Sequence, residues 1–270
     1  MTSRPVLVAM LLGALALDHA QARAQSAGPQ TVKYKLRKET TLQRGCFPPC
    51  LCPMLEATRV RGTLDLTFAE FDGLFNRYDV SNVKWRAILA GEGTHIAGSG
   101  LYRIGGEFAL QNQLVLDLQV GGDPFQRFDS GLLVGGSQFP RIDLSVSIHG
   151  GFCFDTVIDV HAEPAVKLAM SDVDVAWEPV PGAMGYDIVR GDLGALRADG
   201  GDFADATLEC LGNDLEITGL PAGPDPPPGQ AFWFLARAIY TDGPGEYDSG
   251  ELSQARRPDD GIEASNRSCP

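Results

Sequence analysis

The densest group of residues able to do chemistry is a set of histidine and carboxylate side chains near the middle of the chain. Asp155, Asp159 and His161 share one face of an expected strand, because alternate residues of a strand point to the same side. His149 ends the strand before it. Such groups bind metal ions or transfer protons. A solvent-exposed sheet face carries the same residue types, and the spacing is not diagnostic, so we assign no catalytic or metal-binding residue here.

Six cysteines form the second reactive set: Cys46, Cys50, Cys52, Cys153, Cys210 and Cys269. In an exported chain, cysteines predict disulfides. If bridges stay within each half of the chain, Cys210 pairs with Cys269. The first four then allow three pairings, and we expect at least one of the clustered cysteines to reach Cys153. The alternative is a metal site built on the cluster, but its spacing departs from the Cys-x2-Cys pairs of common zinc sites.

Sequence motifs for enzymatic catalysis are absent. Ser130 and Ser249 each lie between an aspartate and a glycine, but no Gly-x-Ser-x-Gly motif surrounds a nucleophile. The chain also lacks a phosphate-binding Gly-Lys-Ser/Thr loop and a dinucleotide fingerprint. Carboxylate pairs for glycoside hydrolysis abound in an acidic β-protein, and nothing selects one pair.

Two segments rich in aspartate and glycine offer oxygen ligands to Ca²⁺, namely Asp199–Asp202 and Asp242–Asp248. Neither follows the spacing of an EF-hand loop, and tight turns have the same composition. We therefore predict no cofactor, with Ca²⁺ as the alternative.

The N-terminal residues 1–24 predict a secretory signal peptide. Arg4 precedes an apolar run, Val6–Leu17, and Ala22-Arg23-Ala24 is a small-x-small cleavage site. The apolar run is shorter than the roughly 20 residues that span a bilayer. We therefore expect a mature chain from Gln25 with no membrane span, located outside the cell, at its surface or in the periplasm.

The chain is acidic, with a net charge of −13 that becomes −14 when residues 1–24 are removed. Nucleic-acid binding needs Lys and Arg to neutralise phosphates, so this charge argues against it. It argues equally against adsorption to anionic membranes.

Residues 31–163 predict a first domain of antiparallel strands. Apolar and polar residues alternate in four runs, of which Leu114–Val120 and Ile142–Ile148 are the clearest, and glycine-rich breaks separate them. One buried and one wet face per strand predicts a β-sandwich or a small barrel. Four segments look like a domain seen in uncharacterised exported bacterial proteins, which carries no known activity: Cys46–Pro53, Tyr102–Phe108, Phe128–Leu132 and Cys153–Asp159.

Residues 164–257 predict a second β-domain. A strand ends at Trp177, a Pro-Val-Pro-Gly-Ala turn follows, and Tyr186–Arg190 begins the next strand. This stretch resembles strands B and C of a fibronectin type III domain, and Leu215–Leu220 and Phe232–Ala238 match its E and F strands. The resemblance implies a two-sheet sandwich with Trp177 in its core, and a spacer or binding scaffold with no named ligand. Bonding of Cys210 to Cys269 would fold the tail, residues 258–270, back over it.

Arg190-Gly191-Asp192 spells the adhesive tripeptide of some fibronectin type III domains, but it follows the C strand instead of lying between F and G. Short motifs of this kind arise by chance. The whole chain predicts an exported all-β, non-enzymatic binding or structural protein that recognises an extracellular protein or polysaccharide. The alternative is a hydrolase of an extracellular polymer with the second domain as an accessory.

Overall fold

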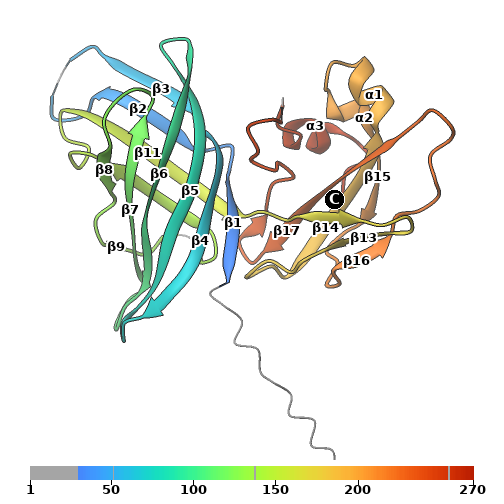
Figure 1. Ribbon diagram of the computed structural model, residues 1–270, viewed down its shortest axis with the longest axis horizontal. Helices are drawn as coiled ribbons and strands as arrows, with labels where there is room; N and C mark the ends of the chain where they lie inside the picture. The colour runs from blue at the N-terminus through green and yellow to red at the C-terminus, as the bar shows by residue number, and fades with distance from the viewer. Residues whose placement is uncertain (1–29, 51, 137, 255) are drawn as a thin grey trace, which may run out of the picture.

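The computed structural model describes residues 30–50, 52–136, 138–254 and 256–270, and strands dominate it (Figure 1). The predicted signal peptide lies outside these residues. Within the described part of the chain, no helix has the length and apolar character needed to cross a membrane.

Most strands of the first half pair with their neighbours in the sequence. They are β1 (Thr31–Leu36), β2 (Thr41–Cys46), β3 (Leu55–Arg59), β4 (Arg61–Phe71), β5 (Phe75–Leu89), β6 (Glu92–Gly105), β7 (Gln111–Val120), β8 (Gln126–Asp129), β9 (Leu133–Val134), β10 (Ile142–Ser147) and β11 (Phe154–Pro164). The main sheet runs β1-β4-β5-β6-β7-β8-β10-β11-β2-β3, with β9 beside β7. Because β11 also pairs with β1, eight strands close into a ring. Of the two predicted architectures, this is the small barrel, and we call it the ring.

The interior of the ring is filled by the residues that alternate inward along each strand. Leu114, Leu116 and Leu118 of β7 are buried, while Asp117 between them is exposed. Trp85 on β5 is fully buried in the same core. The predicted alternation is thus confirmed, and burial of these apolar side chains holds the curved sheet together.

The second half forms two smaller antiparallel sheets, in the orders β12-β13-β16 and β15-β14-β17-β18. Their strands are β12 (Leu168–Met170), β13 (Asp174–Trp177), β14 (Gly185–Asp192), β15 (Thr207–Gly212), β16 (Gly219–Pro221), β17 (Phe232–Tyr240) and β18 (Gly243–Pro244). Trp177 packs edge-to-face on Tyr186, with ring centroids 5.4 Å apart, in a core between the sheets. The chain is therefore all-β, as predicted.

Two features of the second half differ from the prediction. The strand expected over Leu215–Leu220 spans only Gly219–Pro221, because Leu215 exchanges backbone hydrogen bonds of 2.9 and 3.0 Å with Tyr186. Three short helices were also not predicted: α1 (Leu193–Ala198), α2 (Phe203–Ala206) and α3 (Asp259–Ala264). Each is too short to show a 3.6-residue apolar pattern.

Candidate functional site

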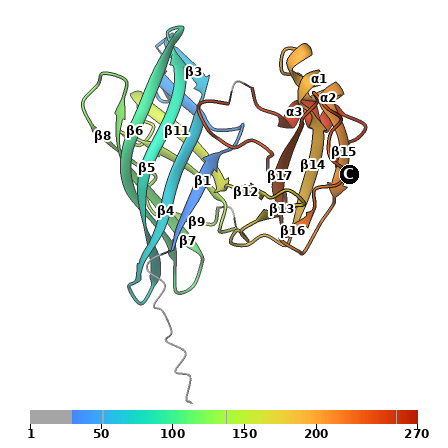
Figure 2. The same ribbon diagram turned by 45° about the vertical axis from the view of Figure 1, so that its right-hand side comes forward.

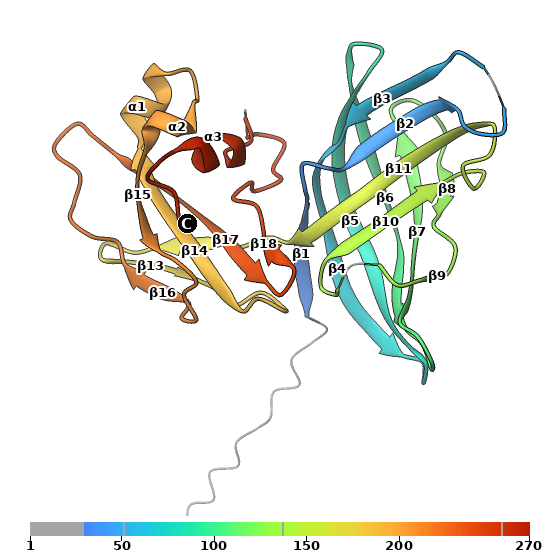
Figure 3. The same cartoon turned by 180° about the vertical axis from the view of Figure 1, so that it is seen from behind.

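The segment between β18 and α3 leaves the second half and lies against the ring. Figures 2 and 3 show it beside β1, between the two halves. Arg61, the first residue of β4, donates from Nη2 to the backbone oxygens of Leu252 and Gln254, both at 2.6 Å. Arg257 donates to the backbone oxygen of Val60 at 3.4 Å. Arginine side chains therefore hold this segment on the ring.

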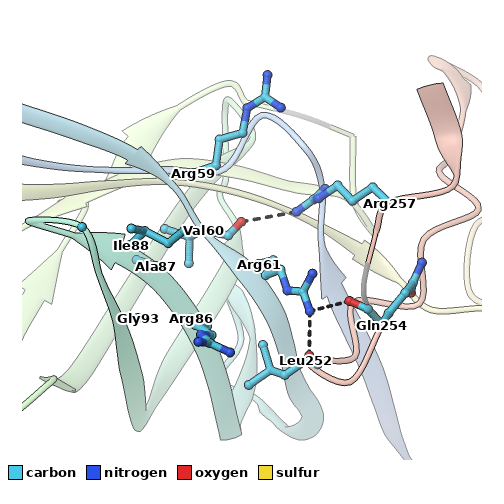
Figure 4. Close-up of a pocket in the computed structure, with 11 residues that line it drawn as sticks. Arg59, Val60, Arg61, Arg86, Ala87, Ile88, Gly93, Leu252, Gln254 and Arg257 are labelled. Atoms are coloured by element: carbon cyan, nitrogen blue, oxygen red, sulfur yellow. Dashed lines mark hydrogen bonds between the residues drawn. The ribbon is translucent and has the colours of Figure 1, made fainter. Parts of the chain in front are cut away.

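An open pocket of about 600 Å³ lies where this segment meets strands β3 to β6 (Figure 4). Four arginines line it: Arg59, Arg61, Arg86 and Arg257. Val60, Ala87, Ile88 and Leu252 supply apolar surface, and Gly91, Gly93 and Gln254 complete the lining. No described residue of the lining carries a carboxylate. In a chain with 35 acidic and 22 basic residues, this arginine pocket has the opposite charge to the whole.

The four arginines differ in how far their charges and hydrogen-bond donors are already engaged by other groups of the protein. The guanidinium of Arg257 lies 3.3 Å from Asp248 and 3.4 Å from Glu246, so its charge is paired. Arg61 is bound only to neutral backbone oxygens. Arg59 and Arg86 are exposed and form no ion pair with any described residue. These two side chains extend on either side of Arg61 in Figure 4 and remain free to bind an anion.

Strand register places two arginines directly opposite one another and a histidine opposite the second. Arg61 on β4 faces Arg86 on β5, and Arg86 faces His95 on β6. Like charges in directly opposed positions destabilise an antiparallel pair. Gly93 gives the Arg86 guanidinium room, because a Cβ there would lie 2.5 Å from Nη2. An anion between these side chains would relieve the repulsion, and planar guanidinium groups bind carboxylates and similar oxyanions through two parallel hydrogen bonds.

A buried polar seam beneath the pocket joins the ring to the second half. Lys35 of β1, only 2% exposed, donates from Nζ to the backbone oxygens of Glu246 and, at 2.6 Å, Asp248. Its ammonium group also lies 3.3 Å from the buried carboxylate of Glu163. Arg141 of the ring lies 2.9 Å from Asp242 and donates to the backbone oxygen of Pro244 at 2.6 Å. Buried charges thus fix the segment that supplies one wall of the pocket.

Glu246 is the titrating group of this seam. Burial, together with the nearby Asp259, raises its pKa to about 7, although the Lys38 amide and the Arg257 and Lys35 cations oppose the shift. Glu163 accepts a hydrogen bond from the Glu246 amide at 2.8 Å and adds another buried carboxylate nearby. The folded protein therefore favours neutral Glu246 more than the unfolded chain does.

This raised pKa predicts that the protein is less stable in mild alkali than in mild acid. A carboxyl whose pKa rises from 4.5 to about 7 on folding stabilises the native state below the unfolded pKa, and that contribution is lost as pH rises to about 7. We expect the free energy of unfolding, measured in urea, to fall by about 2 kcal/mol between about pH 5 and about pH 8. Glu246→Gln should flatten this dependence; an equally steep dependence in the variant would contradict the assignment.

The histidine and aspartate residues noted in the sequence do not form one site. The register puts Asp155, Asp159 and His161 on one face of β11, but Asp155 is buried and accepts hydrogen bonds from the amides of Gly151 and Thr156, both at 2.7 Å. Its carboxylate lies 3.5 Å from His149 Nδ1, so these two residues do meet. The His161 Nδ1 lies 2.7 Å from Asp143. Asp159 instead accepts from Gln43 at 2.8 Å. Among the described residues, no group of three or more potential ligands could hold a metal ion.

All six cysteines are bonded. Cys46 bonds to Cys52, Cys50 to Cys153, and Cys210 to Cys269. The first two bridges tie β2 to the start of β11. The third brings the tail back onto the second half, where Cys269 and Ile262 are buried with Val189 and Tyr247. This leaves no thiol for the metal site considered as an alternative.

The adhesive tripeptide is engaged within the fold. Arg190 pairs with Glu209 and donates to the backbone oxygen of Ala222 at 3.1 Å. Asp192 caps α1 by accepting from the amides of Gly194 at 2.6 Å and Ala195 at 3.0 Å. These contacts give the tripeptide a structural role.

The other sequence candidates also bind neighbours. In the two aspartate-glycine segments, Asp242 pairs with Arg141, Asp248 with Arg257, and Asp202 caps α2 through a 2.9 Å bond to the Ala204 amide. The hydroxyl of Ser130 accepts from the Leu114 amide at 3.0 Å. The hydroxyl of Ser249 bonds to Gln254. Neither serine is bonded to a histidine.

The arginine pocket was not predicted, because its residues are scattered through the sequence. Register alone brings Arg61 and Arg86 together, and Arg257 arrives only when the tail folds back. Two groups of closely spaced arginines, Arg59-Val60-Arg61 and Arg256-Arg257, were the available signal in such an acidic chain.

Comparisons with known proteins add no assignment. No protein-family model matches the chain, and neither a curated protein nor a solved structure matches it.

Proposed function

We propose that the chain is an exported, non-enzymatic binding protein that recognises an acidic extracellular polysaccharide through the arginine pocket. One observation carries the proposal: four arginines surround an open pocket whose described lining has no carboxylate, in a protein of net charge −13. Arg59 and Arg86 would bind the carboxylates of uronic-acid units, because a guanidinium donates two parallel hydrogen bonds to a carboxylate.

The apolar part of the pocket suits a sugar ring. Ile88 is 60% exposed, and Ala87 and Leu252 lie beside it. The carbon face of a pyranose packs on such surface while its charged substituents reach the surrounding arginines. A volume of about 600 Å³ lies within the range of small-molecule sites, so the pocket would accept a short stretch of a chain.

The other features of the protein support export and a scaffold role. Three disulfides favour an oxidising compartment, as residues 1–24 predict. The two small sheets support the inferred fibronectin type III-like sandwich, which holds the segment carrying Leu252, Gln254 and Arg257 against the ring. A hydrolase would need two facing carboxylates in an open cleft, and the described lining of the pocket provides none, so we propose binding.

Binding to charged and neutral polymers tests this function. The mature chain, Gln25–Pro270, should bind polygalacturonate in calorimetry and should not bind dextran. Its affinity should fall as salt is added, because exposed charges are screened. No reducing ends should be released. Equal binding to both polymers, or an affinity that salt leaves unchanged, would contradict recognition by arginine. Binding to proteins alone would show that the partner is a protein and not a polysaccharide.

A further inference from the structure

Large apolar side chains cluster at the end of the ring opposite the arginine pocket. They belong to three chain reversals: the β4–β5 turn, the β6–β7 turn and the segment containing β9. The turn cluster consists of Phe71, Leu74, Phe108, Leu110, Leu133 and Val134. Phe108 is 95% exposed and Val134 is 70% exposed, so these side chains do not pack in the core of the ring.

Backbone hydrogen bonds join the three turns into one surface. The Gly106 amide donates to the Leu74 oxygen at 3.1 Å, and the Gly135 amide donates to the Leu110 oxygen at 2.9 Å. The first two turns border a shallow hollow of about 560 Å³ between Phe71 and Phe108. A continuous exposed apolar surface of this kind marks an interaction site.

The chain enters the ring at this same end. Thr31, the first residue of β1, pairs with Thr67, four residues before Phe71, and their hydroxyls are 2.8 Å apart. Figures 1 and 2 show β1 beginning on the side where the β4–β5 turn lies. The described chain therefore begins beside the turn cluster.

The charges of the turns select the type of surface. Residues 71–74, 106–110 and 131–135 contain no lysine or arginine. The Asp72 carboxylate accepts from the amides of Leu74 at 3.0 Å and Phe75 at 2.8 Å, and Glu107 is exposed. Asp72 is also paired with Arg77 at 3.0 Å, so the turns carry little net charge, and their protruding phenylalanine and aliphatic side chains suit an uncharged apolar interface.

We propose that the turn cluster docks the ring onto a zwitterionic lipid bilayer, with Phe71, Phe108 and Val134 entering the interface. The arginine pocket then stays accessible. Arg61 and Phe71 are at opposite ends of β4, which spans about 33 Å at the rise of an extended strand. The docked protein would hold its pocket at that distance from the lipid. The docking stands independently of what the pocket binds.

Vesicle flotation of the mature chain tests the docking. The chain should float with phosphatidylcholine vesicles, and mixing in phosphatidylglycerol should weaken the partition. Phe71→Ser with Phe108→Ser should weaken it about tenfold for each ring lost. The matched control replaces two exposed apolar residues of the second half, Val173→Ser with Ile217→Ser, which are 66% and 57% exposed, and should float like the wild type.

The docking would be overturned if the wild type did not float, if both double variants lost flotation equally, or if flotation required phosphatidylglycerol. It would also be overturned if the wild type were a dimer in solution and the Phe71/Phe108 variant a monomer. Polygalacturonate binding by the same variants is the second readout. Unchanged polymer binding with lost flotation shows that the fold and the pocket are intact. Flotation without polymer binding would reject the proposed function and leave the docking in place.

Discussion

Replacing Lys35 with methionine is expected to lower the free energy of unfolding by about 4 kcal/mol. The substitution keeps a long apolar stem and removes the ammonium group, which leaves the 2%-exposed Glu163 with one of its two cations, Arg141 at 3.4 Å. The backbone oxygens of Glu246 and Asp248 also lose their donor. The weakened pairing of the buried Glu163 carboxylate and the two backbone oxygens left without a donor together carry this cost.

Two further variants distinguish the effect of removing a buried charge from the effect of removing any lysine. Lys33 on the same strand pairs with Glu251, but both side chains are about half exposed, so Lys33→Met should cost less than about 1 kcal/mol. Adding Glu163→Gln to Lys35→Met should restore part of the stability, because it removes a buried charge that has lost one of its two cations. Equal losses for the two lysines in urea unfolding would contradict the seam described above.

Removing the Cys210–Cys269 disulfide is expected to cost about 4 kcal/mol in the chain-entropy model, because this bridge closes a loop of 59 residues. The Cys46–Cys52 bridge spans six residues, so its removal should cost about 2 kcal/mol. Serine replaces both cysteines in each variant, and thermal unfolding measures the loss.

The tail disulfide should also affect the pocket. Leu252, Gln254 and Arg257 lie between β18 and the α3 tail that Cys269 anchors. The Cys210→Ser/Cys269→Ser variant should therefore weaken polygalacturonate binding, whereas the Cys46→Ser/Cys52→Ser variant should not. A larger loss of stability in the second variant than in the first would contradict this account of the tail.

The fold could be predicted from the sequence wherever burial alternates with each residue. Leu114, Leu116 and Leu118 show this plainly, since a strand with one buried face must follow that pattern. Ring closure could not be predicted, because pairing of β1 with β11 is a contact between the two ends of the first half. Likewise, Leu215 forms backbone hydrogen bonds with Tyr186 instead of extending β16. Tyr186 is distant in the sequence, so this pairing could not be predicted from the local pattern.

The candidate site was less predictable than the fold for a physical reason. Catalytic motifs are recognised by residues that lie close together in the sequence. The arginine pocket instead depends on strand register and on the C-terminal segment that folds back onto the ring. The one basic residue near Arg86 in the sequence is Lys84, which does not line the pocket, and the position of Arg86 opposite Arg61 appears only in the strand register. The residues that did look reactive in the sequence, such as Asp155 and Asp192, hold backbone amides in place.

The most direct test of the central claim is the affinity of three proteins for polygalacturonate at one salt concentration. They are the wild type, Arg59→Ala/Arg86→Ala and the control Arg127→Ala, which removes an exposed arginine on β8 that does not line the pocket and has no ion pair with any described residue. The account predicts about a tenfold loss for each pocket arginine and an unchanged affinity for the control. An unchanged affinity in the double variant, or a comparable loss for Arg127→Ala, would contradict recognition by the arginine pocket.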